Sequence, residues 1–162
     1  MERLWAPWRT KYITRAANMK GCVFCRKLKA KNDCAAYIIE RSRHSFSILN
    51  IYPYNNGHIM IVPYRHVDDL TKLNEEEISD MMALLNRTQK LLTKKLRPDG
   101  FNIGINIGRA AGAGIKNHVH IHIVPRWVGD VNCMPVFTST KVISQSLDAL
   151  YGLLTKCSRA KK

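Results

Sequence analysis

A stretch of alternating histidine and aliphatic residues constrains this chain more than any other feature. Residues 118–124 read His-Val-His-Ile-His-Ile-Val. Successive side chains of a β-strand point to opposite faces, so this pattern predicts a strand with its aliphatic residues in a core and three imidazoles facing one pocket. A core has no need of three histidines, whereas imidazole suits nucleophilic attack, proton transfer and metal ligation near neutral pH. We therefore expect the strand to carry a chemical site.

The length and charge of the chain narrow the remaining possibilities. Its 162 residues have room for one domain with a core, and a hydrophobic content of 46% fits a soluble globular protein. The 26 Lys and Arg residues against 12 Asp and Glu give a net charge of +14, which predicts attraction to phosphates, nucleic acid or acidic membrane surfaces. The basic tail at residues 156–162 is expected to be a solvated terminus.

The N-terminal residues and the cysteines predict a cytoplasmic protein. Residues 1–12 lack the apolar run of a signal peptide, and no later segment approaches a membrane span. The five cysteines include a Cys22-x-x-Cys25 pair, which favours a reducing compartment and a metal site over a disulfide framework. Cys34, Cys133 and Cys157 are expected to be unpaired thiols.

The order of the expected elements predicts an α+β domain. Strands are expected at residues 35–40, 45–49, 57–63, 101–107 and 117–124, with a turn at 53–57. A capping box at Asn74 begins a long amphipathic helix that ends before residues 97–100, and further helices are expected at 22–30 and 141–154. The order lacks βαβ alternation, so it favours an antiparallel sheet of about five strands with a long packed helix and a C-terminal helix. We expect residues 1–20 to form an N-terminal arm and residues 21–162 a single domain.

Several segments resemble the histidine triad (HIT) superfamily. Residues 118–124 match its motif of histidines alternating with apolar residues, and residues 117–130 look like the branch of diadenosine tetraphosphate phosphorylases and related hydrolases. Residues 1–13, 22–25, 50–67 and 101–112 also resemble that branch, so the resemblance covers most of the chain. It implies a HIT-like fold and a nucleotide hydrolase or nucleotidyltransferase. Such an enzyme cleaves dinucleoside polyphosphates at an α-phosphate through a nucleotidyl-histidine intermediate, with water or phosphate as the acceptor.

The histidines divide the chemistry that this reaction needs. His120, in the middle, fits the nucleophile, because a neutral imidazole can attack phosphorus when its other nitrogen is held by a hydrogen bond. The ring of His122 lies about 7 Å along the strand and can donate to a non-bridging oxygen in the transition state. By resemblance, the backbone carbonyl of His118 orients the nucleophile. His58 would lie behind the triad, either in a catalytic role or as a hydrogen-bonded structural histidine.

A glycine-rich segment precedes the histidines and is a candidate cradle for phosphate. Gly108, Gly112 and Gly114 expose backbone N–H groups there, although ordinary turns also use glycine. By resemblance, Asn50 and Asn106 contact the sugar or phosphate of a nucleotide. Related proteins carry Ser or Gln in this loop, whereas this chain has Gly-Ala-Gly at 112–114 and lacks that side-chain donor. The choice between water and phosphate as acceptor therefore stays open.

Cys22 and Cys25 supply half of a tetrahedral zinc site. The alternative is a redox dithiol, but no thioredoxin-like βαβ pattern surrounds the pair. By resemblance to other HIT branches, His66 and His118 would complete a Cys₂His₂ set. Four protein ligands leave no open position, so this zinc would be structural.

Two classes of function compete for this sequence. The first is an enzyme that acts on small nucleotides. The second is a nucleic-acid-binding protein in which the same triad removes adenylate from polynucleotide ends, as the net charge suggests. Repair members of the superfamily resemble a HIT domain followed by a zinc finger, and nothing after Trp127 offers a second metal-binding pair, which favours the first class.

The resemblance also implies at least a homodimer. A short sheet of this kind leaves an edge strand open, and the helix at residues 75–96 is the expected companion surface. Trp127 would either stack on a base or close the core, where a neighbouring Arg126 also suits a cation–π pair.

Overall fold

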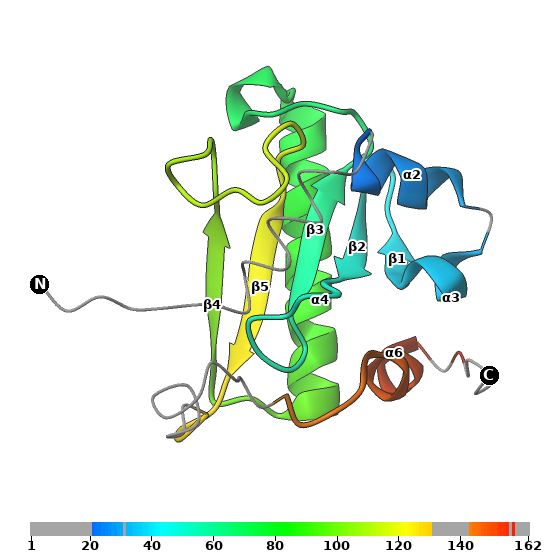
Figure 1. Ribbon diagram of the computed structural model, residues 1–162, viewed down its shortest axis with the longest axis vertical. Coiled ribbons are helices and arrows are strands. Elements are labelled where there is room, and N and C mark those ends of the chain that lie inside the picture. The colour runs from blue at the N-terminus through cyan, green and yellow to red at the C-terminus, as the bar shows by residue number, and fades with distance from the viewer. Residues whose placement is uncertain (1–20, 31, 131–142, 156, 158–162) are drawn as a thin grey trace, which may run out of the picture.

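Five strands form one antiparallel sheet in the order β1-β2-β3-β5-β4, with the long helix α4 along one face (Figure 1). This computed structural model describes residues 21–30, 32–130, 143–155 and 157. The strands are β1 (Ile38–Arg41), β2 (Ser45–Leu49), β3 (Ile59–Pro63), β4 (Gly100–Ile105) and β5 (Ile121–Arg126). The helices are α2 (Val23–Lys29), α3 (Asp33–Ala36), α4 (Glu75–Leu96) and α6 (Leu147–Thr155), with a 3-10 helix η1 (Leu70–Lys72). The predicted α+β class is confirmed.

The boundaries of the predicted domain and arm stay predictions. The N-terminal arm at residues 1–20 lies outside the described residues. Within the described ranges, no helix has the length and apolar character needed to cross a membrane.

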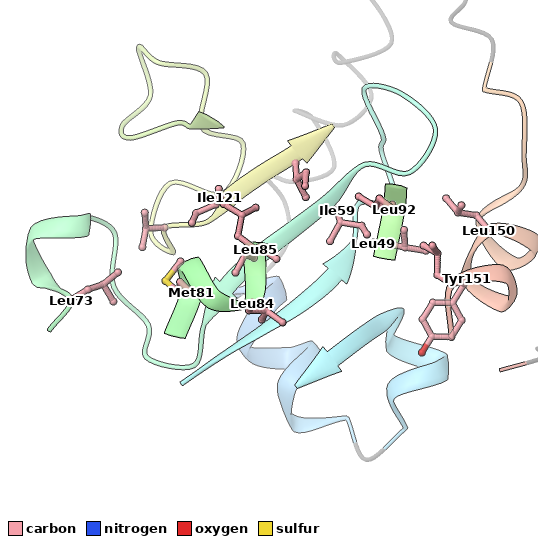
Figure 2. Packing of buried hydrophobic residues seen from close by; sticks show 14 residues of the cluster. Leu49, Ile59, Leu73, Met81, Leu84, Leu85, Leu92, Ile121, Leu150 and Tyr151 are labelled. Carbon is pink, nitrogen blue, oxygen red and sulfur yellow. The ribbon is translucent and has the colours of Figure 1, made fainter. Parts of the chain in front are cut away.

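The sheet separates two apolar clusters. On the α4 face, side chains from the sheet, α4 and α6 pack together, as Figure 2 shows for Leu49, Ile59, Leu84, Leu92, Ile121 and Leu150. The opposite face carries a second cluster, which joins α2 to the sheet through Phe24, Ile38, Phe46, Ile48, Met60 and Val62. Because neighbouring residues of a strand alternate between these faces, Ile121 and Ile123 join the α4 core. His122 lies opposite Met60 in the register of β5 with β3.

Helix α4 begins and ends as its sequence predicts. The Asn74 side chain accepts a hydrogen bond from the Glu77 backbone N–H, and the Glu77 carboxylate accepts one from the Asn74 N–H, which is a complete capping box. Arg97 ends the helix in a left-handed conformation, with φ of 49°. Buried residues of α4, among them Met81, Leu84, Leu85 and Leu92, face the sheet.

The segment before β1 differs from its prediction as a strand at residues 35–40. Residues 33–36 form the short helix α3, because the Asn32 side chain caps it by accepting from the Ala35 N–H at 3.0 Å. Tyr37 then ends α3 in a left-handed conformation, with φ of 63°, and the strand begins at Ile38. The β propensity of this segment was outweighed by a local cap.

A disulfide between Cys34 and Cys157 corrects the expectation that both are unpaired thiols. It joins α3 to the residue that lies two positions beyond α6, across 123 positions of sequence. The same contact region contains hydrogen bonds from the Tyr151 hydroxyl to the Ile38 carbonyl at 2.6 Å and from the Tyr37 hydroxyl to Asp148 at 2.7 Å. Sequence spacing could not pair these cysteines, since only the docking of α6 brings them together. Cys133 lies outside the described residues.

We expect the Cys34–Cys157 bond to stabilise the fold by about 2–4 kcal/mol, because it closes a long loop in the unfolded chain. Denaturant unfolding with and without reductant measures this difference, and Cys34→Ser should remove it. A digest under non-reducing conditions should contain the crosslinked peptide, and Cys133→Ser, the matched control, should retain it. Quantitative alkylation of Cys34 and Cys157 in the native, unreduced protein would contradict the pairing.

Acid should weaken the start of α4. Hydrogen bonds from Arg65 and the Asn74 N–H hold the pKa of Glu77 at about 2, below its usual 4.5 and in spite of burial. A depressed folded-state pKa stabilises the fold above pH 4.5, and this contribution is lost as the pH falls toward 2. Glu77→Gln should cost about 1–2 kcal/mol at neutral pH and flatten the stability profile across this window. The exposed Glu75→Gln is the control, and equal acid sensitivity of both variants would contradict the assignment.

Candidate functional site

The three alternating histidines are buried together at the start of β5. His118, His120 and His122 are 0%, 3% and 9% exposed. The first two precede the strand and His122 lies within it. The rings of His120 and His122 have centroids 4.7 Å apart, and the His58 ring lies 5.0 Å from that of His122. The structure therefore brings together all four histidines that the sequence selected as catalytic candidates.

The hydrogen bonds of His120 leave one ring nitrogen available to attack a substrate. Its Nδ1 lies 2.8 Å from the backbone carbonyl oxygen of His118, so Nδ1 carries the proton and donates. Burial lowers the pKa of His120, which favours the neutral ring. A neutral ring protonated at Nδ1 has its lone pair on Nε2. The His118 carbonyl was predicted to orient the nucleophile, and its hydrogen bond with His120 Nδ1 has the geometry that this role needs.

His58 and His122 form a directed chain of hydrogen bonds. The Tyr54 backbone N–H donates to His58 Nδ1 at 3.0 Å, so that nitrogen must offer its lone pair. The proton of a neutral His58 is then on Nε2, which lies 2.8 Å from His122 Nδ1 and donates to it. His122 in turn carries its proton on Nε2. The Asn50 amide lies 3.3 Å from His58 Nδ1, which fits the same assignment.

His118 has a different role from the two histidines that follow it. Its Nε2–H donates to the Pro63 carbonyl at 2.9 Å, and burial lowers its pKa to about 4. The lone pair on Nδ1 faces Cys22 Sγ at 3.3 Å and Cys25 Sγ at 3.7 Å. His118 therefore directs its lone pair toward the cysteines.

Four predicted metal ligands converge at this point. The donor atoms of Cys22, Cys25, His66 and His118 lie within 4.8 Å of one another, and His66 Nδ1 is 3.3 Å from Cys25 Sγ. Burial and the neighbouring Cys22 thiol raise the pKa of Cys25, so two thiolates at this place need a cation beside them. Two sulfur and two imidazole donors around one centre fit zinc.

Two loops carry the asparagines and glycines that were predicted to bind a nucleotide. Asn50 contacts His58, as described above, and the Asn106–Gly114 segment connects β4 to the triad. Gly108 and Gly112 have positive φ of 78° and 83°, which explains glycine at both positions. The Gly112 N–H donates within the loop to Arg109. A phosphate cradle in this loop would therefore use backbone N–H groups other than that of Gly112.

Trp127 follows β5 and is half-buried. Its backbone N–H donates to Asp130 at 3.1 Å. The neighbouring Arg126 guanidinium binds Asp130 at 2.6 Å and Asn102 at 2.6 Å. These contacts hold Arg126 in a polar cluster, which weakens the cation–π alternative for Trp127.

The sequence analysis did not identify Tyr54 and Phe24 as parts of the site. The Tyr54 ring stacks on His58, with centroids 4.7 Å apart and planes at 29°. The Phe24 ring meets His120 edge-on at 5.1 Å and His118 at 5.4 Å. Tyr54 stands in a segment that reads only as a turn. The position of Phe24 between Cys22 and Cys25 was the available signal that a ring accompanies the metal ligands.

Comparison with known proteins agrees with this geometry. The HIT domain family matches residues 31–128. The AP-4-A phosphorylase of Mycobacterium tuberculosis (strain ATCC 25618 / H37Rv) is 34% identical over 154 residues, which cover 91% of this chain and 79% of that protein. Adenosine 5'-monophosphoramidase hnt1 of Schizosaccharomyces pombe is 30% identical over 106 residues, 65% of this chain and 74% of that protein.

A solved structure has the same fold. The Zn-bound histidine triad family protein from Mycobacterium smegmatis superimposes with a TM-score of 0.66 at 29% identity, covering 84% of this chain and 91% of that one. The family match over residues 31–128 and the sequence identity to the M. tuberculosis phosphorylase show that the chain belongs to the HIT family.

Proposed function

We propose that this chain is a nucleotide hydrolase or nucleotidyltransferase that cleaves dinucleoside polyphosphates of the diadenosine tetraphosphate type at an α-phosphate. The observation that carries the proposal is a pair of rings 4.7 Å apart whose hydrogen-bond partners assign a lone pair to Nε2 of His120 and an N–H to Nε2 of His122. One ring can attack phosphorus while the other donates to oxygen. That the chain is an enzyme accords with two relatives named as a phosphorylase and a phosphoramidase.

The proposed reaction has two displacement steps. In the first, His120 Nε2 forms a bond to the α-phosphorus, and the bond from phosphorus to the leaving phosphate oxygen breaks. His122 Nε2–H donates to an oxygen on which charge develops. In the second, water or phosphate attacks the nucleotidyl-histidine, the P–N bond breaks, and His120 is restored.

Charge on the chain around the triad favours a phosphate substrate. Between Asp99 and Asp130 the sequence carries Arg109, Lys116 and Arg126 and no acidic residue. Arg109 and Lys116 lie exposed in the loop before the triad. In this proposal Asn50, Asn106 and the glycines of that loop hold the nucleotide's sugar and phosphates, and Trp127 stacks on a base.

Incubation of the purified protein with diadenosine tetraphosphate, with and without phosphate, tests the proposal. ADP plus ATP formed only with phosphate indicates phosphorolysis, and AMP plus ATP indicates hydrolysis. Release of adenylate from a 5'-adenylated oligonucleotide, without turnover of diadenosine tetraphosphate, would instead establish the nucleic-acid function that the charge of +14 suggests. Inactivity on both substrates would contradict the proposed enzyme.

A structural zinc ion is part of the proposal. Cys22, Cys25, His66 and His118 would hold it, and bound zinc would supply a crosslink between α2 and the segment before β5. One of these ligands, His118, also accepts a hydrogen bond from His120 through its backbone carbonyl, so the crosslink would stabilise the segment that carries the nucleophile.

A cytoplasmic location is likewise proposed. Reduced zinc ligands at Cys22 and Cys25 fit a reducing compartment. The Cys34–Cys157 disulfide is more typical of an oxidising compartment, so a cytoplasmic location requires that this bond also persists in the reducing cytoplasm.

A homodimer follows from the exposed edge of the sheet. β4 is an edge strand, and its Ile103 is 47% exposed. On α4, Ile78 and Met82 are 42% and 47% exposed. An open strand edge and exposed apolar side chains on a helix are surfaces that a second copy can cover.

Replacement of His120 by Gly should abolish turnover and leave the fold intact, because the imidazole acts as the nucleophile. His122→Ala should lower kcat about 10²–10³-fold with a smaller effect on KM, because its N–H acts on transition-state charge. Steady-state kinetics and circular dichroism measure both effects. A His120→Gly variant within tenfold of wild-type activity would contradict the assignment.

Metal analysis should find one zinc per chain in protein purified without chelator. Cys22→Ala should lose the metal and lower the melting temperature, and Cys133→Ser, the control, should do neither. Loss of zinc should affect stability more than the rate of the chemical step, since all four positions are filled by protein. Well under half an equivalent of zinc, or full stability of Cys22→Ala, would count against the site.

Light scattering at micromolar concentration should give at least a dimer, and Ile103→Asp should shift it toward the monomer because it places a charge on the open edge. A monomeric wild-type protein would refute the dimer.

Trp127→Ala should raise KM for the nucleotide if the ring stacks on a base, and an unchanged KM would remove that role.

A further inference from the structure

The Tyr54 side chain lies against both members of the His58–His122 pair. Its ring stacks on His58 at 4.7 Å and is tilted against His122 at 5.7 Å, with planes at 40°. Its backbone N–H donates to His58 Nδ1 at 3.0 Å. One residue therefore contacts His58 twice, through its main chain and through its ring.

Packing of the core does not account for this position. Among the described residues, the two apolar clusters that stabilise the sheet do not include Tyr54. The rings that it contacts belong to buried polar residues, since His58 is 1% exposed and His122 is 9% exposed. An aromatic ring over this pair keeps water away from the hydrogen bond between His58 Nε2 and His122 Nδ1.

The ring also restricts how His58 can turn. The proton positions of the pair depend on His58 presenting Nδ1 to the Tyr54 N–H and Nε2 to His122. A rotated His58 would place carbon atoms at these positions and break both bonds. The nearly parallel Tyr54 ring, with planes at 29°, forms one wall that opposes this rotation.

We propose that the Tyr54 ring is a positioning residue: it acts through His58 to keep the Nε2–H of His122 directed at the substrate phosphate. This inference rests on the proposed function. It adds a residue outside the histidine triad that determines the rate of the same reaction. Every substitution at position 54 except proline retains the backbone N–H, so replacing the side chain isolates the contribution of the ring.

Kinetics on diadenosine tetraphosphate test the role of the ring. Tyr54→Leu should lower kcat about ten- to hundredfold with KM within about threefold of wild type, because a misplaced group costs rate rather than substrate binding. Tyr54→Phe retains the ring and should restore kcat to within about threefold of wild type. Tyr52→Leu is the matched control, since it makes the same change at an exposed position of the same loop and should leave kcat within about twofold.

Nitrogen-15 NMR of histidine-labelled protein tests the same role without turnover. In the wild type, His122 should show a protonated Nε2 and an unprotonated Nδ1, and Tyr54→Leu should give a mixture of tautomers. A single unchanged tautomer together with unchanged kcat would overturn the proposal. Should Tyr54→Leu fail to fold by circular dichroism, Tyr54→Met removes the ring with a longer side chain and takes its place.

The two readouts separate this inference from the proposed function. A wild-type protein that does not turn over diadenosine tetraphosphate refutes the proposed substrate, while the NMR spectra still decide whether the ring controls the tautomer of His122. An active wild type with an equally active Tyr54→Leu refutes only the role of Tyr54.

Discussion

His118 is the residue on which the rest of the site depends. Its Nε2–H donates to the Pro63 carbonyl, its Nδ1 faces the two thiols, and its own carbonyl accepts from His120. Three polar groups of one fully buried residue thus connect β3, the cysteine pair and the candidate nucleophile. A buried polar group without a partner costs stability, so these bonds are strongly coupled to the fold. The orientation of His120 is therefore set by the same contacts that close this end of the sheet.

His120 and His122 differ in chemistry because the protein holds Nδ1 of each ring in a different protonation state. A backbone carbonyl holds Nδ1 of His120 in its protonated form, whereas the chain from Tyr54 through His58 leaves Nδ1 of His122 unprotonated. Neighbouring rings therefore present opposite groups, a lone pair and an N–H. Fixed hydrogen-bonding groups need no reorganisation when charge develops in the transition state, which is the condition for effective electrostatic stabilisation.

Features encoded in local periodicity were predictable from the sequence. The alternation at residues 118–124 predicted the cluster of imidazoles, although β5 begins only at Ile121 and His118 faces the cysteine pair. The Asn74 capping box predicted the start of α4. Features that depend on tertiary packing were not. The Cys34–Cys157 pair forms only because α6 packs near α3, and the cap at Asn32 turned a β-rich segment into a helix. Tyr54 was missed for a similar reason, since the turn 53–57 has no periodicity that would show which way its ring points.

Gly57 illustrates how the core determines the position of a catalytic side chain. Its φ is 77°, and a Cβ there would lie 2.7 Å from Leu96 and 2.9 Å from Pro125. Only glycine adopts that conformation readily and also lets the chain approach this closely. Gly57 is consequently held against the end of α4 and the end of β5, and this fixes where the next residue, His58, leaves the turn. The bond from His58 to His122 spans a separation of 64 residues, so its 2.8 Å geometry depends on the packing at Gly57 as much as on the two imidazoles.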